Sequence, residues 1–173
     1  SSFFFIFFPV SKLKKEVSSS GGTRLAHQDA DVALKDALRL ARAMTLKTKV
    51  LGITEGGAKA VVLNNCPKSK KFLQSIGDFI QMQKGSFKTA IDIGFTLKDA
   101  KTILSKTDFI DSLSHNAGGL GSTGENTAEG MVHGFKVISN EILKKPLKDC
   151  SVSIQGLGSV GMALSMISLN SSL

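Results

Sequence analysis

The chain has 173 residues, enough for one domain or two small ones, and 42% of the residues are hydrophobic while 21% are charged. These proportions are those of an ordinary globular chain, and they exclude global disorder and a collagen-like or proline-rich fold. The formal net charge is +8, but the lysines are scattered and no basic run is interleaved with stacking aromatic residues, so we expect no nucleic-acid partner.

Residues 1–20 are expected to form a divergent N-terminal segment. Its apolar run, Phe3–Phe8, is much shorter than the ~20 residues that span a bilayer, and no basic region precedes it as in a secretory signal. The run is therefore either a buried strand closed by Pro9 or a remnant of a longer sequence. Ser18–Gly22 then predicts a flexible joint. Two cysteines are too few for a disulfide scaffold, so we expect a reducing compartment, the cytoplasm. We also expect no membrane partner.

The middle of the chain alternates helical and strand-like patterns. Asp29 or Asp31 can cap a helix that runs to about Lys47, and Thr96 can cap a short helix that follows it at 97–104. The continuous apolar run 61–63 is typical of a strand covered on both faces. This alternation predicts an α/β fold. Helices are expected over about 29–47, 70–82 and 97–104, and strands over 49–54, 59–63 and 87–93, with a Glu-Gly-Gly break between the first two strands.

The C-terminal part is expected to hold a glycine-rich loop over 116–126, a helix over 127–143, a strand over 151–155 and a last helix after a glycine turn. The turn, Gly156-Leu157-Gly158-Ser159-Val160-Gly161, has the spacing of a dinucleotide-binding motif. The first glycine would make the tight turn, the second would admit a pyrophosphate, and the third would let the helix pack closely. The motif predicts NAD or NADP without separating them, although a plain strand–helix turn can share its spacing.

Two lysines and an aspartate are the candidates for chemistry. Lys59 follows Gly56 and Gly57, small residues that would let a substrate come close. A lysine in a confined, partly dry site can lose its proton near neutral pH, because burial disfavours the charged form, and can then act as a general base. A second lysine that stays charged, such as Lys47, would pair with a carboxylate, and Asp92 at a strand end could exchange protons with either. Each of them alone also fits an ordinary solvated side chain. The histidines and cysteines show no metal-ligand spacing, so we expect no metal.

Taken together, these pieces resemble the amino-acid dehydrogenase family of leucine, phenylalanine, valine and glutamate dehydrogenases. The similarity covers about Gly21 to Gly161, and the Lys-Ala-Val after the glycines is closer to the leucine and phenylalanine branch. Two positions differ from the family pattern, since Ala58 replaces a glycine and Ser20 replaces an apolar pocket residue. The segments that carry the resemblance, in the family's order, are Gly21–Arg24, Asp36–Lys47, Gly56–Val61, Thr89–Gly94, Thr127–Gly130 and the glycine turn.

The resemblance implies a substrate and dimerisation domain over 21–125, with a mixed sheet flanked by helices, and then the truncated first βα unit of a Rossmann NAD(P)-binding domain over 126–173. It implies NAD(P)-dependent, reversible oxidative deamination of an apolar L-amino acid of the leucine, valine or phenylalanine class to the 2-oxo acid and ammonia. The complete protein would be a homo-oligomer. The alternative is a catalytically inactive fragment that serves as an interaction or oligomerisation module.

The resemblance also implies a role for each site residue. Lys59 would be the general base that activates the attacking water, and Asp92 would shuttle protons to and from the amino group. Lys47 would hold the substrate α-carboxylate, helped by the backbone of Gly21 and Gly22. On the cofactor side, Thr127 would contact the nicotinamide end, and the remaining cofactor contacts would come from Gly156, Gly158, Ser159, Val160 and Gly161.

Overall fold

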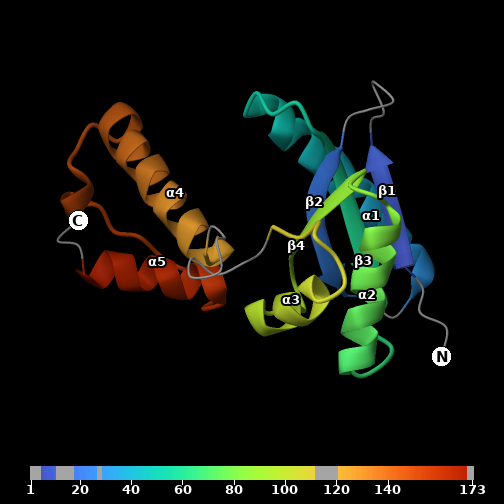
Figure 1. Cartoon of the computed structure of the whole chain (residues 1–173). Coiled ribbons are helices and arrows are strands. Elements are labelled where there is room, and N and C mark those ends of the chain that lie inside the picture. The colour runs from blue at the N-terminus through green and yellow to red at the C-terminus, as the bar shows by residue number, and fades with distance from the viewer. Residues whose placement is uncertain (1–4, 11–17, 27–28, 112–120, 171–173) are drawn as a thin grey trace. The chain divides into compact units, whose positions relative to one another are not determined.

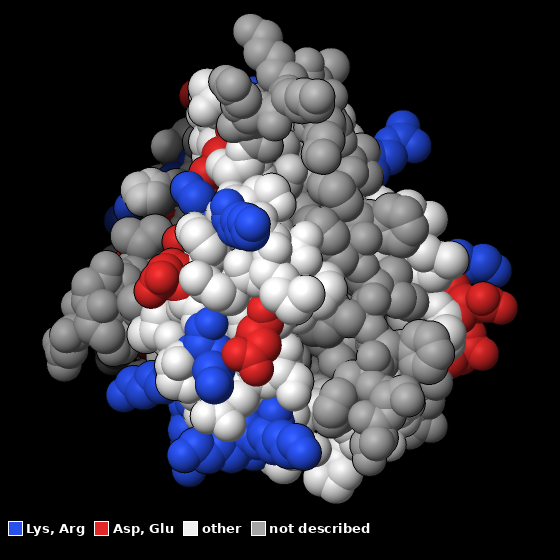
Figure 2. Space-filling model, turned by 45° about the vertical axis from the view of Figure 1, so that its right-hand side comes forward, with Lys and Arg blue, Asp and Glu red and all other residues white. Residues whose placement is uncertain are grey.

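The computed structural model describes residues 5–10, 18–26, 29–111 and 121–170. The chain forms two compact units, Ser1–Gly119 and Leu120–Leu173 (Figure 1). Within the part of the chain that the structure describes, no helix is both long enough and apolar enough to cross a bilayer. On the face seen in Figure 2, basic side chains lie in several groups with acidic side chains among them, in keeping with the scattered lysines of the sequence.

The first unit is built on a four-stranded mixed sheet, which confirms the expected α/β fold class. Strand β2 lies parallel to both β3 and β4, whereas β1 is antiparallel to β3 and forms an edge. Pro9 is tolerated within β1 because an edge strand does not need every N–H for the ladder. In spatial order the strands are β1 (Phe5–Val10), β3 (Gly56–Val62), β2 (Ser19–Leu25) and β4 (Phe87–Ile91).

Helices cover the two faces of this sheet unequally. Helix α1 (Ala30–Val50) packs mainly along β3 and β1, where its buried alanines meet Val61 and Leu63. Helices α2 (Lys70–Met82) and α3 (Leu97–Leu104) bury the opposite face in the main hydrophobic core. On the α1 side, the stretches of β2 and β4 beyond α1 are therefore left half-buried.

The caps explain why the helices begin where they do. The Asp29 carboxylate accepts the Val32 N–H at the start of α1, which decides between the two expected caps. Thr96 and Asp99 form a reciprocal capping box at the start of α3. The expected helices over 70–82 and 97–104 are confirmed residue for residue.

Four expectations in the first unit are wrong. Residues 18–22 are no flexible joint, because β2 begins at Ser19, and Gly21 lies so close to Ala58 that a Cβ there would be 1.8 Å from its carbonyl oxygen. The expected strand over 49–54 is absent, since α1 continues to Val50 and a turn follows. The strand expected over 59–63 starts earlier, at Gly56, and the strand expected over 87–93 ends at Ile91.

The second unit contains α4 (Thr123–Val137), a π-helical turn η2 (Ile138–Ile142), a short 3₁₀ turn η3 (Leu147–Asp149) and α5 (Ser159–Asn170). Helix α4 begins inside the expected loop over 116–126, of which residues 116–120 lie outside the described residues. Ala128 and Val132 of α4 pack against Leu164 of α5. The expected strand over 151–155 is wrong, because these residues are not in a strand. A strand needs a neighbouring strand for its backbone hydrogen bonds, and none lies beside this segment in the described part of the unit.

Gly57 sets how closely α1 approaches the sheet, which generates a first prediction. A Cβ on Gly57 would lie 2.0 Å from the Thr45 backbone nitrogen, so backbone must move to admit it. Gly57→Ala is expected to lower the free energy of unfolding by about 1–3 kcal/mol through overpacking, measured by urea unfolding. The matched control is Gly134→Ala on α4, where nothing lies within 4 Å and helix propensity predicts a gain of up to ~1 kcal/mol. Equal effects of the two changes would contradict this packing.

Candidate active site

Strand β3 places Lys59 on the face that α1 covers. Successive side chains of a strand point to opposite faces, so Lys59 shares its face with Gly57 and Val61, both packed against α1. Only 6% of Lys59 is exposed. Its amine extends across β2, where a Cβ on Gly22 would lie 2.9 Å from Nζ. Gly22 is therefore needed to make room for the amine.

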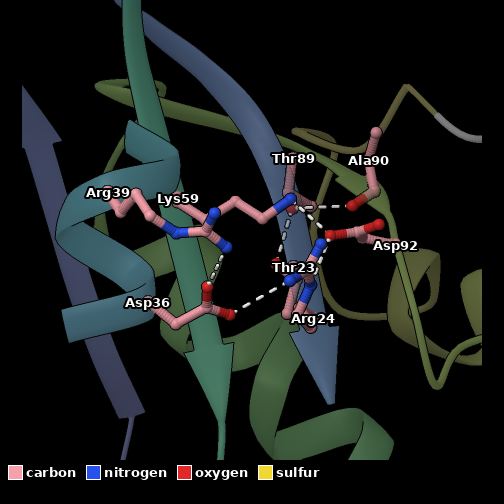
Figure 3. Close-up of polar contacts among 8 residues, drawn as sticks. All are labelled: Thr23, Arg24, Asp36, Arg39, Lys59, Thr89, Ala90 and Asp92. Carbon is pink, nitrogen blue, oxygen red and sulfur yellow. Dashed lines mark hydrogen bonds and ion pairs between the residues drawn. The ribbon is translucent and has the colours of Figure 1, made fainter. Parts of the chain in front are cut away.

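The Lys59 amine binds Asp92, which lies on the other side of β2. Asp92 directly follows β4, and its backbone N–H donates to the Thr23 carbonyl of β2 at 3.1 Å. The Lys59 Nζ donates to Asp92 Oδ2 at 2.5 Å, a contact between residues 33 positions apart in the chain (Figure 3). The two residues expected to carry proton transfer thus lie together on the half-buried side of β2 and β4.

A second cation binds the same carboxylate oxygen. Arg24 Nε donates to Asp92 Oδ2 at 2.9 Å, and Arg24 Nη1 donates to Asp36 Oδ2 of α1 at 3.0 Å. The other oxygen of Asp36 accepts from Arg39 Nη2 at 2.9 Å. Figure 3 shows this chain of alternating charges running from β3 through β4 and β2 to α1. It connects the site to the helix that covers the sheet.

The surroundings shift the proton affinity of both groups. Burial lowers the pKa of the Lys59 amine, and the Asp92 carboxylate opposes this shift only in part. Burial alone would raise the pKa of Asp92, but the hydrogen bonds and charges of Lys59, with smaller help from the Ile93 backbone and Arg24, outweigh burial and lower it. The result is an anion that stays ionised beside an amine that releases its proton more readily than a solvated lysine.

The glycine turn of the second unit has the tight turn and the helix start of its motif, but no strand precedes it in the described residues. Gly156 adopts a φ of +89°, as the tight turn demands, and a Cβ on Gly158 would meet nothing within 4 Å. A Cβ on Gly161 would lie 2.0 Å from the Gly156 carbonyl oxygen, so only glycine allows α5 to start this close. The Met162 N–H donates to the Gly158 carbonyl at 2.9 Å and opens the helix.

The other predicted site residues are described within their own units. Lys47 is exposed on α1, about 200° around the helix from buried Thr45, and its role stays a prediction. Thr127 is exposed on α4, where its hydroxyl donates to the Thr123 carbonyl at 2.6 Å. The Gly56 N–H donates to the Ser18 carbonyl at 3.0 Å and helps to align β3.

Arg24 and Asp36 received no role from the sequence. The signal was present in the strand pattern, because Arg24 lies two residues after Gly22 and so on the same face of β2. Its partner on α1 could not be foreseen without the packing of that helix. Among residues 5–10, 18–26, 29–111 and 121–170, no three His, Cys, Asp or Glu side chains gather as metal ligands would.

Comparison with known proteins decides the family. A model of the family described as "Glu/Leu/Phe/Val dehydrogenase, dimerisation domain" matches residues 14–108. The chain belongs to this family. The family resemblance seen in the sequence is thereby confirmed, and the homologues of the chain are amino-acid dehydrogenases.

Individual relatives agree with the family match. The chain is 36% identical to leucine dehydrogenase of Geobacillus stearothermophilus over 148 residues, which are 83% of this chain and 40% of the relative. It is 34% identical to phenylalanine dehydrogenase of Lysinibacillus sphaericus over 145 residues, 82% of this chain and 38% of the relative. The chain thus spans about two fifths of the length of these dehydrogenases.

Solved structures support the fold. L-tryptophan dehydrogenase from Nostoc punctiforme aligns with a TM-score of 0.60 and 30% identity, over 86% of this chain and 42% of that one. The hetero-hexameric glutamate dehydrogenase from Thermus thermophilus aligns with a TM-score of 0.71 and 20% identity, over 95% of this chain and 46% of that one. The second likeness shows the amino-acid dehydrogenase fold alone.

The charge pairing at the site yields a second prediction. Asp92→Asn removes the anion that raises the pKa of Lys59 most, so only the weaker effect of Asp36 still opposes burial and Arg24, and the titration midpoint of Lys59 falls. The midpoint is read from the Cε and Nζ shifts of isotope-labelled lysine by NMR. Asp99→Asn is the control, because that carboxylate binds Lys68 instead, at 2.8 Å. A midpoint that rises, or falls equally in both variants, would contradict the pairing.

Proposed function

We propose that this chain forms the substrate-binding part of an NAD(P)-dependent amino-acid dehydrogenase. The reaction is the reversible oxidative deamination of an apolar L-amino acid, of the leucine, valine or phenylalanine class, to the 2-oxo acid and ammonia. The observation that carries the proposal is the buried Lys59 amine, 2.5 Å from Asp92 Oδ2. The dehydrogenase names of the relatives support the class of substrate.

Lys59 and Asp92 divide the proton transfers between them. Deprotonated Lys59 takes a proton from the water molecule that attacks the oxidised α-carbon, which is the work of a general base. Asp92 exchanges protons with Lys59 and with the departing amino group, since it already lies within hydrogen-bond distance of the amine. Burial lowers the pKa of Lys59, as a base that works near neutral pH requires, and the ionised Asp92 beside it can accept a proton.

Positioning of the substrate falls to the surroundings of this pair. Gly22 exposes its backbone beside both functional groups without a Cβ to exclude a ligand, and Gly21 precedes it on β2. Lys47 is proposed to hold the substrate α-carboxylate through its charge. Gly57 contributes indirectly, because it lets α1 lie close over the strand that carries Lys59.

The glycine turn fits a dinucleotide. The positive φ of Gly156, the open space at Gly158 and the helix start after it are what a pyrophosphate needs, so we assign Gly156, Gly158, Ser159, Val160 and Gly161 to cofactor binding. Thr127 is assigned to the nicotinamide end. When bound, NAD or NADP accepts the hydride from the substrate α-carbon, while the protein supplies position and charge.

The division into a substrate and dimerisation domain over 21–125 and the start of a Rossmann domain over 126–173 is part of the same proposal. So is a homo-oligomeric assembly, which the name of the family's dimerisation domain supports. The competing function is an inactive module that only mediates interaction or oligomerisation. The observation that favours it is the description of the matched family model, over residues 14–108, as a dimerisation domain.

A chimera tests the proposal directly. The chain is joined to the C-terminal remainder of Geobacillus stearothermophilus leucine dehydrogenase, and formation of reduced NAD with leucine or phenylalanine is followed by absorbance. The chimera is expected to turn over, whereas the chain alone is not. A folded chimera that binds cofactor but deaminates neither amino acid would favour the inactive module.

Within the active chimera, substitutions of the two lysines are expected to change different kinetic constants. Lys59→Ala should lower kcat by roughly 10²- to 10⁴-fold, the size of a lost general base, with cofactor affinity nearly unchanged. Lys47→Ala should chiefly raise KM, because it removes substrate binding. Lys49→Ala, an exposed lysine on the same helix, is the control and should change neither. Small and equal effects of the Lys59 and Lys47 variants would overturn the assigned roles.

A further inference from the structure

One oxygen atom of the site serves two cations. Asp92 Oδ2 accepts from Lys59 Nζ at 2.5 Å and from Arg24 Nε at 2.9 Å. The Arg24 side chain is 16% exposed, and its far end binds Asp36, whose side chain is 10% exposed, at 3.0 Å. Because the guanidinium group is largely buried and two of its nitrogens bind different carboxylates, the Arg24 side chain is held in one conformation.

We propose that Arg24 is a positioning residue of the deamination site, which fixes the Asp92 carboxylate and supplies the permanent positive charge that allows Lys59 to give up its proton. The inference rests on the proposed function for its catalytic meaning. Its charge arrangement stands on the contacts alone and is tested without turnover.

The charge balance explains why a second cation is needed. If Lys59 were the sole cation on Asp92, loss of its proton would leave a half-buried carboxylate without a partner, which costs free energy and would keep the proton on the amine. Arg24 stays charged at every accessible pH, so Asp92 remains paired when Lys59 is neutral. The guanidinium also repels the ammonium directly and thereby lowers the pKa of Lys59.

The shape of arginine suits this position better than that of lysine. Its planar fork lets Nε and Nη1 bind two different carboxylates at once, here Asp92 at the end of β4 and Asp36 on α1. An ammonium at the same place would carry the charge without the fixed fork. Arg24 therefore couples the position of the Asp92 oxygen to the seating of α1 on the sheet.

In the described part of the chain, the charges with the largest effect on the Lys59 amine are those of Asp92, Arg24 and Asp36. Arg39 also binds Asp36, at 2.9 Å, but its side chain is 75% exposed. Arg39 is therefore the matched control, an arginine on the same carboxylate that does not touch Asp92.

The test is the titration of Lys59 in the chain itself, followed through the Cε and Nζ shifts of labelled lysine. Arg24→Gln is expected to shift the midpoint to higher pH, whereas Arg39→Gln leaves it at the wild-type value. Amide spectra establish that each variant is folded. A folded Arg24→Gln protein with an unchanged or lowered midpoint would overturn the proposal.

A second variant keeps the inference testable if Arg24→Gln does not fold. Arg24→Lys retains the charge but loses the two-carboxylate fork, so its midpoint should rise less than in the glutamine variant and more than in Arg39→Gln. No rise would show that fixed geometry is irrelevant and would overturn the positioning role.

Activity gives an independent readout in the chimera. The alkaline shift of Lys59 should move the rising limb of the pH–kcat profile to higher pH in Arg24→Gln but not in Arg39→Gln. If the chimera is inactive while the titration shifts as expected, the proposed function fails and the charge arrangement survives. If the chimera is active and neither the titration nor the profile shifts, the role of Arg24 fails alone.

Discussion

A charged amine removed from water needs either a carboxylate or a way to lose its proton, and the Lys59 site offers both. Burying an isolated ion costs several kcal/mol even after relaxation, and Lys59 is only 6% exposed. Asp92 offsets this cost with a direct hydrogen bond to the amine. Arg24 also binds Asp92, so the carboxylate keeps a cationic partner when the amine is neutral. The need for room at Gly22 follows from this pairing.

The sheet brings the pair together through the order of its strands. Lys59 lies in β3 and Asp92 at the end of β4, with β2 between them, so the lysine side chain must cross a strand that has no side chain at Gly22. Helix α1 packs on β3 and β1 and leaves the neighbouring strands half-buried on that face. The core under α2 and α3 buries the opposite face, so the Lys59 amine is held beside the half-buried stretches of β2 and β4.

Much of this could be predicted where local signals agree. Helices α2 and α3 have caps and apolar spacing that point to the same ends, and Lys59 and Asp92 were expected to act together. Prediction failed where a distant contact decides. The sequence around Gly21 predicts a flexible joint, because the close contact between Gly21 and the Ala58 backbone is visible only in the structure. The end of α1 likewise depends on its packing against β3. Segment 151–155 has strand-like residues but no neighbouring strand in the described part of its unit.

The central claim is that burial beside a paired carboxylate makes the Lys59 amine easier to deprotonate than an ordinary lysine. The most direct measurement is an NMR titration of the labelled Lys59 amine in the folded wild-type chain and in the same chain unfolded in urea. The account predicts that Lys59 titrates at clearly lower pH in the folded chain, because burial lowers its pKa. Titration at the same pH in both states would contradict it.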